Sequence, residues 1–190
     1  MRFRASSLAV VAALAGCGGD DNQVTSGFPG VIISPVRSSI SAKVTFHDSN
    51  GGSHVQSVIA MTDASNLCTK ITQNPAYFQT TATENFNAVI MWFPPDRVGT
   101  GIIGQSFGDG TAINAEVAVG IVSGGTPGVF KFGGVTNSGT IVVTQFNTGP
   151  GGEAIGNFDF GVFDSNGVPR EMLGKFKAIY CQGMEAAQLP

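Results

Sequence analysis

The chain of 190 residues is long enough for one domain with a sizeable hydrophobic core, and 42% of it is hydrophobic whereas only 12% is charged. This balance excludes an intrinsically disordered chain, and the 27 glycines are typical of a β-rich protein with many turns. The formal net charge is −3 and the basic residues form no positive stripe, so we expect no binding to nucleic acid.

The N-terminus has the layout of an export signal. Two arginines precede an apolar run from Leu8 to Leu14, which is shorter than the about 20 residues that span a bilayer. The next residues complete "LAGC" (Leu14 to Cys17), which resembles the lipobox of bacterial lipoproteins. In that family the chain is cut before the cysteine, which carries a diacylglycerol and usually an N-acyl chain such as palmitate. The resemblance implies a signal peptide at residues 1–16 and lipidation of Cys17; an ordinary secretory signal or an uncleaved anchor is the alternative.

The lipoprotein resemblance also implies a location in the cell envelope. Removing Arg2 and Arg4 leaves 8 basic residues against 13 acidic ones, a net charge of −5. In lipoprotein sorting an Asp after the lipidated cysteine favours the inner membrane, so Gly18 favours the outer membrane. Residues 17–38 are rich in Gly, Ser, Asp and Pro, so we expect a flexible tether before a single β-rich domain at 39–190. Within the tether, Val31 to Ile33 are expected to dock as an edge strand.

Two cysteines remain if Cys17 is lipidated. Cys68 and Cys181 would lie in an exported compartment, where disulfides persist, and we expect them to pair. In the chain-entropy model, closing so long a loop contributes about 4–5 kcal/mol of stability. Two free buried thiols are the alternative. A metal site is less favoured because these cysteines and the two histidines contain no close-spaced ligand pair, and we expect no cofactor.

Short strands dominate the rest of the chain. Alternating apolar and polar residues, bounded by turn sequences, predict strands at 39–46, 55–61, 86–93, 112–122, 128–132, 139–146, 154–163 and 171–181. The segment "TDASNLCTKITQNP" predicts the one helix, with Asp63 or Ser65 as its cap and Pro75 as its end. The fold class is therefore all-β, an antiparallel β-sandwich or barrel of about eight to nine strands with one short helix.

The last third of the chain resembles a group of small lipoproteins. "SGTIVVTQF", "AIGNFDFGVF" and "LGKFKAIYC", between Ser138 and Cys181, look like the tails of β-rich lipoproteins common in myxobacteria. Those proteins often pair a mid-chain cysteine with one that closes the last strand, as Cys68 and Cys181 would. The group has no assigned activity, so the resemblance implies a fold and a disulfide but no function.

The glycine-rich stretch "GTGIIGQSFGDG" (residues 99–110) matches a dinucleotide-binding motif. Gly99, Gly101 and Gly104 form G-x-G-x-x-G, in which a helix should follow the glycines and receive the pyrophosphate at its N-terminus. Here a helix-poor run follows. We therefore expect these glycines to bend a strand rather than to hold a cofactor.

The same stretch contains G-x-S-x-G around Ser106, the motif of a hydrolase nucleophile. That motif needs a strand-to-helix turn and a later histidine, whereas His47 and His54 both precede Ser106. The order His, Asp63, Ser106 is formally available to a serine hydrolase, but the neighbourhood of Ser106 does not resemble that family. We expect no catalytic residue, with a small hydrolase using Ser106 or His47 as the alternative.

Ligand-binding residues are few. His47 and His54 flank the first hairpin turn, and Asp48 and Asp164 begin turns that resemble calcium loops without their closing Glu. We expect no metal, and a calcium- or zinc-dependent adhesin is the alternative. Trp92 stands in an apolar strand and is expected to be buried.

The loop around Tyr77 and Phe78 is the candidate contact surface, for an envelope protein or a glycan, and the alternative is that its aromatic residues fold back on the core. With two histidines and no dense polar cluster, the chain favours a non-catalytic binding or structural module anchored to the envelope membrane.

Overall fold

The computed structural model describes residues 21–27, 30–47, 53–77, 86–102, 106–107, 111–112, 117–122, 129–131, 135–163 and 166–187. These residues form twelve β-strands, one α-helix and one short 3-10 helix. The helices are α1 (Leu67–Gln73) and η1 (Met184–Ala186). The strands are β1 (Gln23–Ser26), β2 (Ser38–His47), β3 (Ser53–Thr62), β4 (Phe86–Phe93), β5 (Gly99–Ile102), β6 (Ser106–Phe107), β7 (Thr111–Ala112), β8 (Val117–Val122), β9 (Val129–Lys131), β10 (Val135–Phe146), β11 (Glu153–Phe163) and β12 (Pro169–Tyr180).

The strands pair along one path, β7-β6-β5-β10-β11-β12-β2-β3-β4-β8-β9, and β1 pairs with β12 beside this path. All the pairings are antiparallel except that of β12 with β2, which is parallel over Ile179–Tyr180 and Ile40–Ser41. The N–H of Cys181 extends this short junction by donating to the carbonyl of Ser41 at 2.8 Å. At the junction the sheet turns back on itself.

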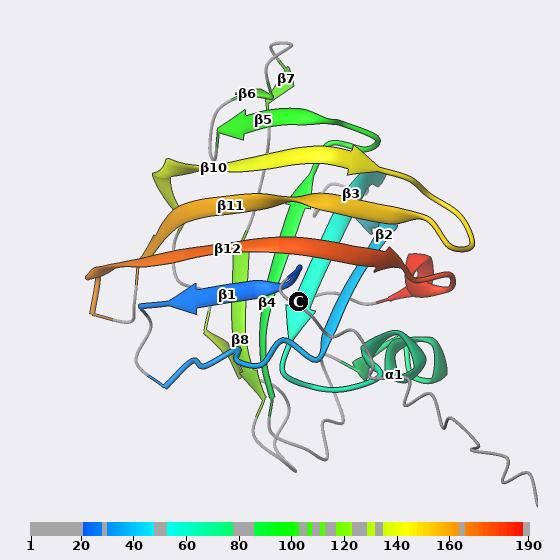
Figure 1. Cartoon of the computed structure of the whole chain (residues 1–190), viewed down its shortest axis with the longest axis horizontal. Helices are drawn as coiled ribbons and strands as arrows, with labels where there is room; N and C mark the ends of the chain where they lie inside the picture. Colours follow the sequence, from blue (N-terminus) through cyan, green and yellow to red (C-terminus); the bar gives the residue numbers. More distant parts are fainter. Residues whose placement is uncertain are drawn as a thin grey trace, which may run out of the picture.

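The turn in the sheet makes two layers. Figure 1 shows a front layer of β5, β10, β11, β12 and β1, and a rear layer of β2, β3, β4 and β8 whose strands cross behind it at a steep angle. This is the arrangement of an orthogonal β-sandwich. In the described part of the chain the two ends of the path, β7 and β9, do not pair, so the sheet is not closed into a barrel. The predicted β-rich class with one short helix is confirmed, and the number of strands exceeds the prediction.

One hydrophobic core fills the space between the layers. Alternate residues of β11 and β12, such as Phe158, Phe160 and Phe176, face inward and are buried, whereas Asn157 and Asp159 face outward and are exposed. The rear layer contributes Ile59, Met61, Val89, Met91 and Phe93 to the same core. The front layer is therefore buried on one face only, as its alternating sequence predicts.

A second core covers the far face of the rear layer. Ile90 and Trp92 of β4 are buried there together with Leu67 and Ile71 of α1 and Met184 of η1. The strands β3 and β4 are thus buried on both faces, which explains why their sequences are nearly continuous apolar runs. The predicted burial of Trp92 is confirmed, with 2% of it exposed.

Helix α1 begins without either of the predicted caps. Asp63 instead accepts hydrogen bonds from the backbone N–H of Asn87 at 2.8 Å and from its Nδ2 at 3.2 Å. The N–H of Leu67 donates to Ser38 Oγ at 3.3 Å, so a residue of β2 partners the first turn. The prediction of a local cap was wrong because a distant strand supplies the acceptor and because Asp63 is used to hold β4.

The packed domain starts earlier than the sequence predicts. Within the expected tether, Gln23–Ser26 form β1 along β12, while Val31 and Ile33 are buried in the core without forming a strand. The edge strand was expected at Val31 to Ile33 but lies at β1. The reason is that β2 pairs only with the last two residues of β12, Ile179 and Tyr180. The edge of β12 from Met172 to Lys175 is thereby left open to β1. Neither described helix has the length and hydropathy of a membrane span.

Candidate functional site

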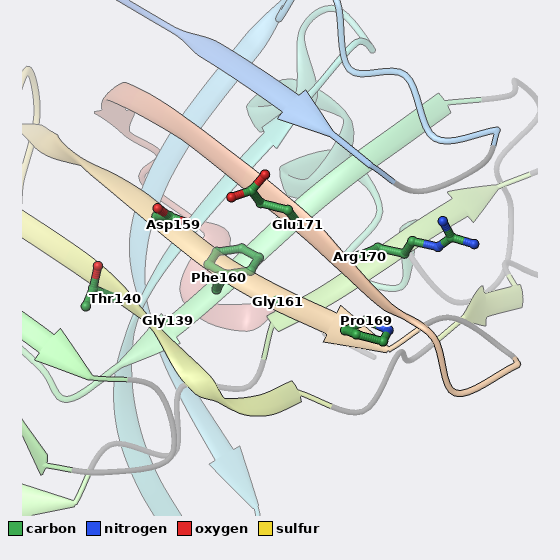
Figure 2. A pocket seen from close by; sticks show the side chains of 8 residues that line it. All are labelled: Gly139, Thr140, Asp159, Phe160, Gly161, Pro169, Arg170 and Glu171. Atoms are coloured by element: carbon green, nitrogen blue, oxygen red, sulfur yellow. The ribbon is translucent and has the colours of Figure 1, made fainter.

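A shallow hollow of about 470 Å³ opens in the front layer near the end of the β11–β12 hairpin. Its lining comes from three neighbouring strands, β10, β11 and β12, and Figure 2 shows the eight residues concerned: Gly139, Thr140, Asp159, Phe160, Gly161, Pro169, Arg170 and Glu171. The register pairs Asp159 with Thr140 and Gly161 with Glu171. The hollow is therefore built by strand pairing, from residues far apart in the sequence.

Two glycines line the hollow. Gly161 follows Asp159 by two residues, so both occupy the same face of β11, and the missing side chain leaves space beside Glu171. Gly139 has φ +139°, and a Cβ on it would lie 2.4 Å from the Cβ of Phe160. A side chain at Gly139 would therefore collide with the wall of the core as well as strain the backbone.

The side chains around the hollow are mostly polar and charged. Figure 2 shows the carboxylates of Asp159 and Glu171 on the same side of the sheet, while the guanidinium of Arg170 extends away from them. Asp159 and Glu171 are exposed to solvent, and Thr140 is half-buried. Carboxylates and a hydroxyl can accept hydrogen bonds from ammonium or hydroxyl groups of a ligand. The lining thus offers two carboxylates, a hydroxyl and a guanidinium to a ligand.

A second polar group of residues lies at the C-terminal end of β12. The hydroxyl of Tyr180 donates to Glu185 Oε1 at 2.5 Å, and the N–H of Gly183 donates to Glu185 Oε2 at 2.6 Å. The hydrogen bond to Glu185, with burial and the negative charge of Glu185, raises the pKa of Tyr180 to about 12. Burial acts to raise the pKa of Glu185, but the hydrogen bonds from Tyr180 and from backbone N–H groups outweigh it, so this pKa lies below its usual value. The group fixes η1 onto the end of the strand.

The structure joins Cys68 to Cys181, the pairing that the sequence predicts. The sulfur atoms are 2.09 Å apart, the Cα atoms 5.5 Å apart, and the two residues are separated by 113 positions in the sequence. Cys68 belongs to α1 and Cys181 follows β12 directly. The bridge therefore ties the helix that covers the rear layer to the last strand of the front layer.

Tyr77 of the candidate contact loop is buried, as the alternative of aromatic residues folded back on the core expects. Tyr77 is only 7% exposed, and its ring stacks on that of Phe86 with centroids 5.6 Å apart and planes 8° from parallel. The ammonium of Lys70 lies 5.9 Å from the centre of the same ring. Tyr77 is thus part of the second core, because the rear layer offers it an aromatic partner that the sequence did not reveal. Phe78 and Cys17 lie outside the described residues.

The glycine-rich stretch belongs to the edge of the front layer. Gly99–Ile102 form β5, which pairs with β10, and Ser106 stands in β6, where it pairs with Ala112 of β7. The next described element after Ser106 is therefore a strand, whereas both the dinucleotide motif and the hydrolase motif need a helix. This agrees with the expectation of a strand for Gly99 and Gly101, and Gly104 lies outside the described residues.

The predicted metal candidates are not brought together by the backbone. The register pairs His47 with Ser53 and His54 with Phe46, so the two histidines are not cross-strand partners. Among the described residues there is no group of three or more His, Cys, Asp or Glu arranged to hold a metal ion. Asp48 and Asp164, which begin the calcium-like turns, lie outside the described residues.

Comparisons with known proteins return nothing for this chain. No protein-family model, no curated protein and no solved structure matches it. Its function is therefore argued from its own residues. The sequence did not reveal the hollow or the contact between Tyr180 and Glu185. Alternation indicates that Asp159 faces outward, but its proximity to Glu171 depends on the register of β11 with β12.

Proposed function

We propose that this chain is a lipid-anchored domain of a bacterial cell envelope that serves as a non-catalytic binding or structural module. The observation that carries the proposal is "LAGC" at Leu14 to Cys17, placed directly after a short apolar run. The described fold is compatible with cleavage before Cys17, since β1 and every other described element come after it. We place the domain at the outer membrane because Gly18 follows the lipidated cysteine.

The disulfide supports export. Cys68 and Cys181 pair across 113 residues, and disulfides of this structural kind persist in the periplasm and outside the cell rather than in a reducing cytosol. Because Cys68 and Cys181 are joined to each other, Cys17 is the one cysteine of the sequence left for another modification.

The hollow supports a binding role. It combines the outward carboxylates of Asp159 and Glu171 with the hydroxyl of Thr140 on the solvent-exposed face of the front layer. A glycan, which offers hydroxyl groups, or a basic segment of an envelope protein has the matching chemistry.

The anchor is tested by mass spectrometry of the N-terminal peptide from the full chain expressed in a bacterium. We expect residues 1–16 to be absent and Cys17 to carry diacylglycerol and an N-acyl group, and the Cys17→Ser variant to lack both. An unmodified Cys17, or residues 1–16 still attached, would contradict the anchor.

The non-catalytic role is tested on the same protein. We expect a serine-reactive fluorophosphonate probe to leave it unlabelled, and labelling of Ser106 would instead support the hydrolase alternative. We also expect a chelator to leave the midpoint of thermal unfolding unchanged. A chelator-dependent fall of that midpoint would support the metal-dependent adhesin.

A further inference from the structure

The lipidated cysteine and the folded domain are separated by very little chain. Asn22 is fixed to β12, because its Oδ1 accepts the N–H of Lys177 at 2.8 Å and its Nδ2 donates to the carbonyl of Lys177 at 3.3 Å. Gln23 then pairs with Lys175. Five peptide units join Cys17 to Asn22, and fully extended they span about 18 Å. Whatever path these residues take, the lipid is attached close to this part of β12.

The outward side of β12 near Asn22 combines positive charge with exposed apolar side chains. Its successive outward positions are Leu173, Lys175, Lys177 and Ile179, and we call these four residues the β12 patch. Leu173 is 38% exposed and Ile179 is 58% exposed, although both are large and apolar. Lys175 is exposed. Lys177 forms an ion pair with Glu153, in which Nζ lies 3.4 Å from Oε1 and both side chains are partly open to solvent.

The patch has the composition that a bilayer surface favours. Lysine side chains place their methylene groups along apolar surface and their ammonium groups at the level of lipid phosphates. Leucine and isoleucine gain free energy when they enter the boundary between head groups and acyl chains. Cations beside a membrane anchor are attracted to anionic lipids within about a Debye length of the surface.

The sign of the charged side chains changes along β12. Because β1 runs antiparallel to β12, Gln23 lies beside Lys175 while Ser26 lies beside Met172, farther from the anchor (Figure 1). Glu171 stands at that far end of the strand, whereas Asp159 of the hollow is the cross-strand partner of Leu173. Lys175 and Glu171 are four residues apart, about 13 Å along the strand. Lys175 and Lys177 thus make this part of β12 locally basic in a chain whose net charge after cleavage is −5.

We propose that the β12 patch lies against the bilayer that holds the lipid of Cys17, with Lys175 and Lys177 at the phosphates of anionic phospholipids and with Leu173 and Ile179 at the head-group boundary. The proposal rests on the lipidation of Cys17. It orients the domain on the membrane through the outward face of β12.

Photo-crosslinking to lipid tests the contact on the full, lipidated chain. The protein is reconstituted into vesicles of equimolar phosphatidylcholine and phosphatidylglycerol, with p-benzoylphenylalanine in place of Ile179. The matched control carries the same photo-reactive residue in place of Val98, which is 57% exposed and precedes β5 at the opposite edge of the front layer. We expect phospholipid adducts at position 179 and none at position 98. Equal adduct yields at the two positions, or none at 179, would overturn the proposal.

A charge reversal tests the role of the lysines. Lys175→Glu should reduce the adduct yield at position 179 by about fivefold in the vesicles that contain phosphatidylglycerol, and should have little effect in pure phosphatidylcholine. Arg97→Glu, next to the control position, makes the same change in charge and should leave the yield unaltered. The electrostatic contact would be overturned if the adduct yield at position 179 changed neither with Lys175→Glu nor with removal of phosphatidylglycerol.

The same samples separate this inference from the proposed function. Mass spectrometry reports whether Cys17 is acylated. If Cys17 is acylated and position 179 gives no lipid adduct, the contact is refuted and the anchor stands. If Cys17 is unmodified, the anchor is refuted and the contact that rests on it falls too.

Discussion

The two layers of the sandwich differ in how many of their faces are buried. In the rear layer, β3 and β4 are covered by the front layer on one side and by α1 and η1 on the other. In the front layer, β11 and β12 bury their inward residues and expose their outward ones. The front layer is therefore where surface residues are free to serve binding, and the rear layer is where most changes should cost stability.

The disulfide is expected to have the largest effect, because it joins the two layers. Replacing Cys68 and Cys181 by alanine together should reduce the free energy of unfolding by about 4–5 kcal/mol, the value for closing a loop of this length in the chain-entropy model. Urea unfolding of the variant measures the loss, and the wild-type protein with a reductant should show a loss of similar size. A loss below about 1 kcal/mol would show that the layers hold together without the bridge.

The difference in burial between the layers is tested by one substitution in each layer, at a residue that faces away from the other layer. Ile90→Ala, on the far face of the rear layer, should cost about 2–5 kcal/mol because it leaves a cavity in the second core. Asn157→Ala, on the exposed face of the front layer, should change the free energy of unfolding by less than about 0.5 kcal/mol. Urea unfolding of the two variants compares the layers directly, and similar losses would remove the distinction between them.

A substitution at Gly139 tests the close packing of β10 against Phe160 in the front layer. Gly139→Ala should cost about 1–3 kcal/mol, because its φ is strained for alanine and because its Cβ would collide with Phe160. Gly149→Ala is the matched control, since Gly149 has φ +103° but no atom lies within 4 Å of the place that its Cβ would take. Thermal unfolding should show a larger loss for Gly139→Ala, and equal losses would mean that the contact with Phe160 is unimportant.

The smallest effect concerns the contact between Tyr180 and Glu185. The lowered pKa of Glu185 stabilises the fold above the ordinary pKa of Glu, and this contribution is lost as the pH falls through the lowered value. The raised pKa of Tyr180 acts oppositely, since its contribution is present below pH 10 and is lost as the pH rises toward about 12. At neutral pH, Glu185→Gln should cost less than about 1 kcal/mol.

Ultraviolet titration reports on Tyr180 directly, because the chain has 2 tyrosines and Tyr77→Phe leaves it as the only one. In that background Glu185→Gln should lower the pKa of Tyr180 from about 12 toward 10. An unchanged pKa of Tyr180 would show that the hydrogen bond to Glu185 does not raise it.

The strands were predictable where burial follows a simple period. Alternation located β11 and β12, and the apolar run around Trp92 located β4. β1 was missed because Gln23–Ser26 is polar and gains its partners only from the open edge of β12. The sequence left Tyr77 open between an exposed loop and the core because its neighbours in sequence are polar, while its burial comes from Phe86. The hollow depends on the register that sets Gly161 beside Glu171, which no local pattern encodes.

The position of β12 in the sheet has a consequence for biogenesis. It is the last strand in the sequence, yet it pairs with β11 on one edge and with both β1 and β2 on the other. Among the described strands, the two layers therefore have no hydrogen-bonded junction until β12 has been synthesised. Contacts this distant in sequence form slowly, and strand edges stay open while they are awaited. A chain of this design needs protection from aggregation until β12 has been synthesised.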